Sequence, residues 1–204
     1  MAPSSTPPGS KNSIPERRAQ ILDCAERLLA HYGPAKTTIG DIARETGIGI
    51  GSVYLEFGSK DDIIGELARR RHERVLEAMR RATAHGSYAE RLTRALEARI
   101  QTLFELSGQG MHACDLVFCK STAVKTSYGR FRDDELELVA QLLRDGTKAG
   151  ELEVKQPKRA AELLQRAYAT LSPPWIFEQD RKEVLACVRA MNELLLLGLL
   201  RRHR

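Results

Sequence analysis

Signals for the start and end of helices recur along almost the whole chain, and this constrains its fold most. Ser59 with Asp62 and Ser87 with Glu90 have the spacing of a helix N-cap and its third helical residue. Apolar residues follow both signals at intervals of three and four, and Gly86 stands where a helix should end. No run of alternating β-branched residues predicts a strand. We therefore expect an all-α fold with about nine helices, including one each near 110–121, 130–149, 157–171 and 180–201.

Composition limits the class of protein further. The 204 residues are 42% hydrophobic, which suffices for a sizeable core, and the net charge of +5 permits a polyanionic partner without requiring one. Four cysteines without a Cys-x-x-Cys pair favour a reduced, cytoplasmic setting. The longest apolar run, 194–200, is far shorter than the roughly 20 residues of a membrane span. This length excludes a membrane protein, so we expect no membrane partner. Residues 1–13 are rich in serine and proline, and we expect a disordered tail there.

The segment 36–54 carries the most specific signal. It predicts two short helices that meet at a glycine-containing turn, with Ile42, Ala43 and Val53 spaced to pack across each other. Thr38 can cap the first helix, whose free N–H groups can face a phosphate. This is the pattern of a helix-turn-helix, in which the second helix enters the major groove of DNA.

The chain resembles the TetR family of transcriptional repressors at these residues and just beyond them. The resemblance covers 15–75 and rests on Thr37-Thr38, Asp41-Ile42-Ala43, Gly47-Ile48, Gly51-Ser52-Val53-Tyr54, Phe57 and Ser59-Lys60. Beyond residue 75 the match is one of length and helical content only. The resemblance implies a homeodomain-like DNA-binding domain at 14–74. It implies an effector-binding and dimerisation domain of helices at 75–204.

The resemblance also assigns roles to residues. Those that match phosphate-holding positions are Thr38, Tyr54 and Lys60, and those that match groove-facing positions are Gly40, Gly49, Ile50, Gly51 and Ser52. Gly49 stands where the family often has a serine or threonine cap, and Ile50 stands where a polar residue is common. Isoleucine can contact a thymine methyl group but cannot hydrogen-bond a base. Recognition of the base sequence should therefore depend more on Arg44, Ser52 and DNA shape.

The second half of the chain should hold an effector. The resemblance implies a cavity among the helices that follow the DNA-binding unit, although core packing alone accounts for most aromatic residues there. Small-molecule pockets are mostly apolar and aromatic, so we expect a mostly apolar effector. The candidate lining residues are Met111, Phe118, Tyr128, Tyr168 and Trp175.

The last predicted helix is apolar on more than one face. A central core helix would show this pattern, but excess apolar surface also marks an interface between subunits. The resemblance implies a dimer interface built from the last two helices, so we expect a homodimer. The residues predicted to form its interface are Val184, Val188, Met191, Leu195 and Leu199.

Other functions have weaker support. No catalytic, cofactor or metal constellation stands out, and a nucleotide-binding enzyme that uses Gly47–Gly51 would need a strand before that segment and a third glycine where Ser52 stands. We therefore expect a non-enzymatic, ligand-responsive repressor that binds a pseudo-palindromic operator in double-stranded DNA as a dimer. An activator or architectural DNA binder of the same fold stays open, because nothing in the sequence encodes repression.

Overall fold

The computed structural model describes residues 14–199, so the predicted tail at 1–13 lies outside the described residues. Within that range the chain has eight α-helices, three short 3-10 helices and no β-strand, which confirms the all-α prediction. The elements in chain order are α1 (Ile14–Tyr32), α2 (Ile39–Thr46), α3 (Ile50–Glu56), α4 (Lys60–Ala82), α5 (Tyr88–Ser107), η1 (Ala113–Leu116), α6 (Thr122–Lys148), α7 (Pro157–Ala167), η2 (Ala169–Leu171), η3 (Trp175–Glu178) and α8 (Arg181–Leu199).

The α-helix predicted near 110–121 does not form, and this part of the prediction is wrong. Only the short 3-10 helix η1 stands there. Gly110 adopts φ 158°, and a Cβ at this position would lie 2.5 Å from the carbonyl oxygen of Ala30. The backbone N–H of His112 also donates to that oxygen at 2.8 Å. The segment therefore docks onto the end of α1, and this contact replaces the hydrogen bonds of a continuous helix.

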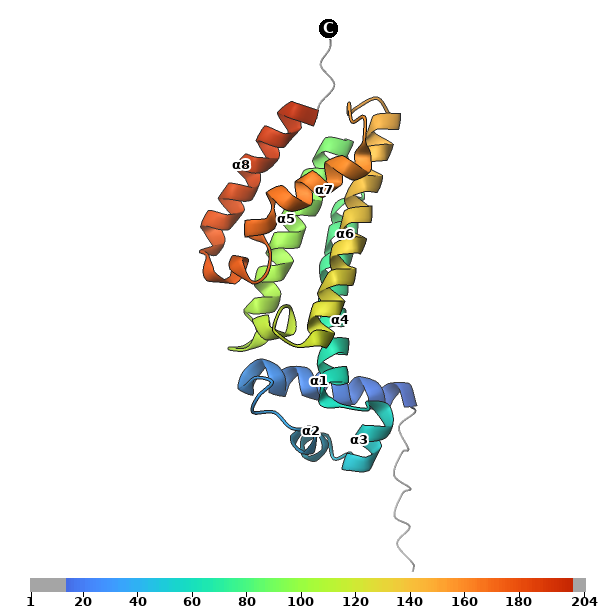
Figure 1. Cartoon of the computed structure of the whole chain (residues 1–204), viewed down its shortest axis with the longest axis vertical. Helices are drawn as coiled ribbons and strands as arrows, with labels where there is room; N and C mark the ends of the chain where they lie inside the picture. The colour runs from blue at the N-terminus through green and yellow to red at the C-terminus, as the bar shows by residue number, and fades with distance from the viewer. Residues whose placement is uncertain (1–13, 200–204) are drawn as a thin grey trace, which may run out of the picture.

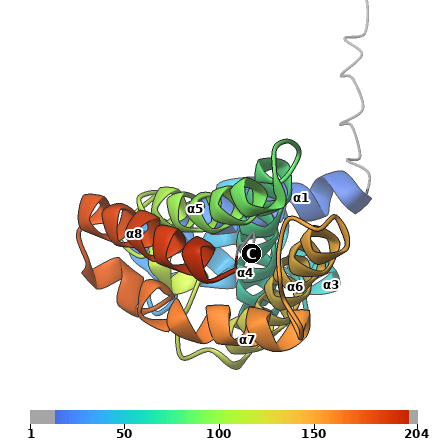
Figure 2. The ribbon, with the colours of Figure 1, turned by 90° about the horizontal axis from the view of Figure 1, so that it is seen from above.

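The helices form two units joined by α4. Helices α1, α2 and α3 gather at one end, and α4 leaves them to run into a bundle with α5, α6, α7 and α8 (Figure 1). Viewed from above, α4 lies between α5 and α6, with α7 and α8 beyond them (Figure 2). Helix α4 packs against both α5 and α6, while α7 packs on α6 and α8 packs on α5.

Helix α4 contributes to both hydrophobic cores. Its first half places Ile63 and Leu67, both fully buried, in the core of the first unit. Its second half places Val75 and Met79, also fully buried, in the core of the bundle. A tilt of α4 in the bundle would therefore move the first unit with it.

A buried arginine reinforces this connection. The guanidinium of Arg71 on α4 is fully buried and donates from Nε to Oε1 of Glu26 on α1 at 2.9 Å. Its Nη1 donates to the carbonyl oxygens of Leu106 and Ala113 at 2.8 and 3.2 Å. Burial lowers the pKa of Arg71, and the charge of Glu26 opposes that shift. One side chain therefore links α4 to α1 and to both ends of the α5–η1 connection.

Candidate functional site

The helix-turn-helix is held by local capping and by a shared core. Thr38 caps α2, whose C-cap Gly47 adopts the left-handed conformation with φ 69° that ends the helix. On α3, Val53 is fully buried, while Ile50 and Tyr54 are 53% and 52% exposed. Helix α3 thus packs one face on the core and presents the opposite face to solvent.

The glycines at the start of α3 place no side chain on that outer face. A Cβ at Gly49 or Gly51 would meet no atom within 4 Å, so packing within the chain does not require glycine at either position. Glycine within a helix costs about 0.5–1 kcal/mol relative to alanine. Gly49 is also the N-cap of α3 and supplies no side-chain hydrogen bond. These features suit a helix that another molecule approaches closely, in line with the predicted groove-facing role.

Thr38, Asp41 and Arg44 form a hydrogen-bonded chain at the start of α2. The hydroxyl of Thr38 donates to Oδ2 of Asp41 at 2.7 Å and accepts from the backbone N–H of Asp41 at 3.1 Å. The hydrogen bonds from Thr38 lower the pKa of Asp41, and Arg44 adds an ion pair at 2.6 Å. Thr38 and Arg44 both face solvent. Their DNA contacts, and those of Gly40 and Ser52, stay predictions.

Lys60 has a role that the sequence did not indicate. Its Nζ donates to the carbonyl oxygens of Pro34 and Thr37 at 2.7 and 3.0 Å. The first residue of α4 therefore fixes the turn between α1 and α2. Its predicted phosphate contact stays untested and would have to use the remaining N–H of the ammonium group.

Two arginines near the start of α1, which no sequence pattern indicated, contact the end of α3. Arg18 donates to the carbonyl oxygen of Glu56 at 2.6 Å and lies 4.0 Å over the ring of Phe57. Arg17 forms an ion pair with Glu56 at 3.7 Å. The partners are 38 and 39 positions apart, so no local pattern could have revealed them.

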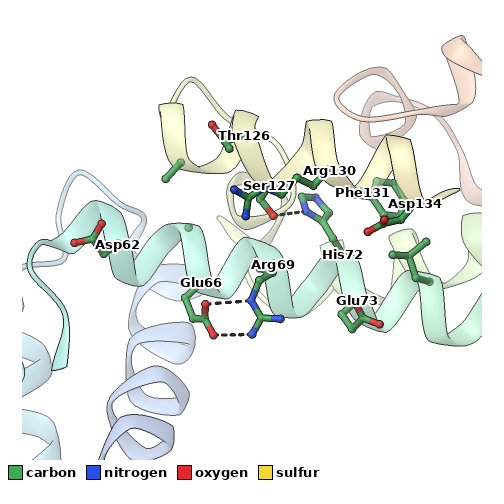
Figure 3. A pocket seen from close by; sticks show the side chains of 13 residues that line it. Asp62, Glu66, Arg69, His72, Glu73, Thr126, Ser127, Arg130, Phe131 and Asp134 are labelled. Carbon is green, nitrogen blue, oxygen red and sulfur yellow. Dashed lines mark hydrogen bonds and ion pairs between the residues drawn. The ribbon is translucent and has the colours of Figure 1, made fainter. Parts of the chain in front are cut away.

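A groove of about 450 Å³ lies between α4 and α6 (Figure 3). The two helices lie very close at Gly65, where an added Cβ would be 2.8 Å from the Cβ of Ala123. Glu66 and Arg69 form a two-pronged ion pair along the rim, with hydrogen bonds of 3.1 and 2.7 Å. The rim is charged, so this groove does not match the mostly apolar pocket that was expected.

His72 lies at the base of this groove and links α4 to α6. Its Nδ1 is 2.8 Å from the hydroxyl of Ser127, and its Nε2 is 2.9 Å from the carbonyl oxygen of Val117. The ring stacks on Phe131 with a centroid distance of 5.1 Å. Burial lowers the pKa of His72 to about 4. The imidazole is therefore neutral near pH 7.

A second cavity, of about 240 Å³, brings together Tyr128 and Trp175 between α5, α6 and the end of α7. Tyr168 is buried, donates to Oδ1 of Asn192 at 2.6 Å and lines a smaller adjoining cavity. Phe118 packs edge-on against Tyr128 with a centroid distance of 5.1 Å. Four of the five predicted lining residues thus lie in or next to this region, and their contact with an effector stays a prediction.

Met111 does not belong to this region, and its assignment is corrected. The side chain is 85% exposed, because the segment around Gly110 docks on α1 and turns Met111 to solvent.

The predicted subunit interface also needs correction. Val184 and Val188 are 1% and 0% exposed within a single chain and pack in the bundle core, so they have no surface left for a second subunit. Met191 and Leu195 are half-buried against the same core. The side chain of Leu199 lies outside the described residues. Among the described side chains of α8, Leu194 is a large apolar one that is mostly exposed, at 71%.

Comparisons with known proteins agree with this geometry. Residues 21–67 match the family model described as bacterial regulatory proteins, tetR family. The chain is 26% identical to the HTH-type transcriptional regulator AcrR of Shigella flexneri, over 92% of this chain and 93% of that protein. It is 35% identical to the HTH-type transcriptional repressor KstR2 of Rhodococcus jostii, over 49% of this chain and 48% of that protein.

Solved structures share the fold. A transcriptional regulator from Cytophaga hutchinsonii superposes with a TM-score of 0.73 at 20% identity, covering 91% of this chain and 99% of that one. Residues 21–67 therefore carry the tetR-family domain of bacterial regulatory proteins, and the chain shares the fold of solved transcriptional regulators. Because the family and the relatives are regulators, the alternative of a nucleotide-binding enzyme is dropped.

Over the described part of the chain, every helix is too short or too polar to cross a membrane.

The open space at Gly51 gives a test of the outer face of α3. Gly51→Ala should raise the free energy of unfolding by about 0.5–1 kcal/mol, because alanine favours the helix and its methyl group meets no neighbour. The same methyl group should weaken binding to a duplex that the wild-type chain binds. Gly129→Ala on α6, where a Cβ also meets nothing, is the matched control and should stabilise without affecting DNA. Equal DNA affinity of the two variants in fluorescence anisotropy would contradict the groove-facing assignment.

The low pKa of His72 predicts a loss of stability in mild acid. The unfolded chain takes up a proton at this histidine near its ordinary pKa of 6.5, whereas the folded chain does so only near pH 4. Stability should therefore fall between these values as pH is lowered, by up to about 3 kcal/mol. Urea denaturation of wild type and His72→Gln between pH 7 and 4 isolates this contribution. Parallel pH curves for the two proteins would show that His72 is not buried as a neutral base.

Proposed function

We propose that this regulator is a dimeric repressor that binds a pseudo-palindromic operator in double-stranded DNA and releases it when an effector binds the helical bundle. The observation that supports DNA binding most strongly is the outer face of α3, where Gly49 and Gly51 leave open space beside the exposed Ile50 and Tyr54. Repression is supported by relatives such as KstR2, which is named a transcriptional repressor.

On DNA, the contacts would divide into two kinds. Tyr54 and the N-terminus of α2 at Thr38 would contact phosphates. Such contacts fix the position of the protein on the duplex but do not distinguish one base from another. Ile50 would cover a thymine methyl group, and Ser52 and Arg44 would supply hydrogen bonds. Arg44 can leave Asp41 at little cost, because its side chain is 80% exposed and such ion pairs are weak.

Dimerisation would use the outer faces of α7 and α8. Leu163 on α7 is 51% exposed and Leu194 on α8 is 71% exposed. Small exposed residues on the same two helices would let helices of a second subunit approach closely; they are Ala167, Ala186, Cys187 and Ala190. Two copies of this surface would meet about a two-fold axis and form a four-helix contact.

The effector would occupy the cavity beside Tyr128 and Trp175 and act on DNA through α4. Helix α6 lines this cavity and is bound to α4 through His72 and Ser127. Helix α4 in turn carries the first unit through Arg71 and Glu26. A shift of α6 would therefore change the separation of the two α3 helices in a dimer. Binding of effector and of DNA would then oppose each other by the same factor.

The proposed interface is tested by Leu194→Arg. A charge in a desolvated contact without a partner costs several kcal/mol, so sedimentation should show a monomer and DNA affinity should collapse. Leu194 is mostly exposed within one chain, so the variant should fold and keep its helical circular dichroism. Met111→Arg, at a position that is 85% exposed and far along the chain from α8, is the control and should stay dimeric. A dimeric Leu194→Arg protein would remove this interface.

Selection of bound sequences from random duplex DNA tests the function as a whole. The wild-type chain should enrich two half-sites related by two-fold symmetry, with centres about 10 base pairs or a multiple apart. Ile50→Ala should relax the preference at one base pair of each half-site, which we expect to be a thymine. Enrichment of flexible or A-tract DNA without half-sites would point to an architectural binder, and no enrichment would refute the proposal.

A further inference from the structure

A charged pair is buried inside the bundle beside the larger internal cavity. Arg99 on α5 and Glu135 on α6 are 3% and 5% exposed, and Nε of the arginine lies 2.6 Å from Oε1 of the glutamate. The guanidinium is held further by Nη1, which donates to the carbonyl oxygen of Leu171 at 3.0 Å, and by Nη2, which donates to the hydroxyl of Ser172 at 2.9 Å. The arginine is thus fixed on three sides.

The carboxylate of Glu135 lacks one of its hydrogen bonds. Within the described part of the chain, no group hydrogen-bonds its Oε2, although this oxygen is buried. The ion pair does not supply the missing contact, because Nε of Arg99 faces the other oxygen, Oε1, at 2.6 Å, and this N–H itself makes no hydrogen bond. A buried carboxylate oxygen without a donor is costly, and native structures rarely leave one unsatisfied. Oε2 is therefore a buried acceptor that can still receive a hydrogen bond from a bound molecule.

Two adjoining cavities reach this pair. Arg99, Glu135 and Ser172 line both the cavity of about 240 Å³ and the smaller one of about 10 Å³. The smaller cavity is at the minimum size for one water molecule. The larger one is bounded by the aromatic side chains of Tyr128 and Trp175 and can take a small organic group.

The charges around the cavity decide what kind of donor fits. Arg132 and Arg166 also line it and are exposed, so three arginines face one glutamate. An ammonium group would meet a net positive charge, whereas a neutral hydroxyl would not. Gln165 does not compete for the ligand, because its amide oxygen accepts from Arg132 at 2.8 Å and its amide nitrogen donates to the carbonyl oxygen of Arg132 at 2.9 Å.

We propose that this cavity binds a flat aromatic hydroxy acid. Its hydroxyl group donates to Oε2 of Glu135, its ring lies between Tyr128 and Trp175, and its carboxylate lies near Arg132 and Arg166. The role of this ligand as effector rests on the function proposed above, but its binding does not. The ligand is accordingly more polar than the aromatic content of the sequence predicts.

The test uses a matched pair of fluorescent probes on the full chain without DNA. 6-Hydroxy-2-naphthoate should bind at least about tenfold more tightly than 6-methoxy-2-naphthoate, in which a methyl group replaces the donated proton. Removing both charges together, in Arg99→Met/Glu135→Leu, avoids leaving a single buried charge and should preserve the fold. This double variant should lose the preference for the hydroxyl group. Glu137→Gln, an exposed neighbour on α6, should keep it.

The mouth of the cavity is tested separately. Arg166→Gln should weaken both probes by a similar factor and leave the ratio of their affinities unchanged. Failure of both probes to bind, equal affinities in the wild type, or a preference that survives in the double variant would each overturn the proposal. If 6-hydroxy-2-naphthoate binds with the expected preference but leaves DNA affinity unchanged, the cavity assignment holds and the effector linkage fails.

Discussion

The buried guanidinium of Arg71 is the interaction on which the rest of this structure depends. It joins α4 to Glu26 on α1 and to two carbonyl oxygens at the ends of the α5–η1 connection. A buried cation that lost Glu26 would carry an uncompensated charge, which is strongly destabilising. The first unit and the bundle are therefore held in one relative position by a contact that tolerates little displacement.

This constraint explains how two distant surfaces can influence each other. Helix α3 lies at one end of the molecule (Figure 1), whereas the cavity beside Tyr128 is lined by residues of the bundle. Between them, α4 takes part in both cores, and His72 ties it to α6. Under the proposed function, a change in the position of α6 would be passed on through α4, because tightly packed cores do not deform continuously.

The sequence predicts those features of the fold that depend on interactions between residues close together in the chain. Capping signals, glycine stops and apolar spacing predict the helices and the helix-turn-helix, since each depends on residues a few positions apart. The contacts of Lys60 with Pro34 and of Arg71 with Glu26 join residues 26 and 45 positions apart, and no local pattern encodes them. The segment near 110–121 was wrongly predicted as a helix because its docking on α1 overrides local preference.

The same limit applies to the faces of α8. Apolar spacing marks Val188 and Leu194 alike, but only the packing of α5 decides that the first is buried and the second is exposed. The unsatisfied oxygen of Glu135 is likewise invisible in a sequence, because it depends on the geometry of a pair 36 positions apart.

Hydrogen–deuterium exchange of the full chain, with and without a selected operator duplex, tests the central claim most directly. If Arg71 couples the two units, DNA binding should slow amide exchange in α2 and α3 and also in 108–116, where the bundle meets α1. In Glu26→Gln the slowing at 108–116 should be lost, while that in α3 remains. Protection confined to residues 14–60 in the wild type would contradict the account.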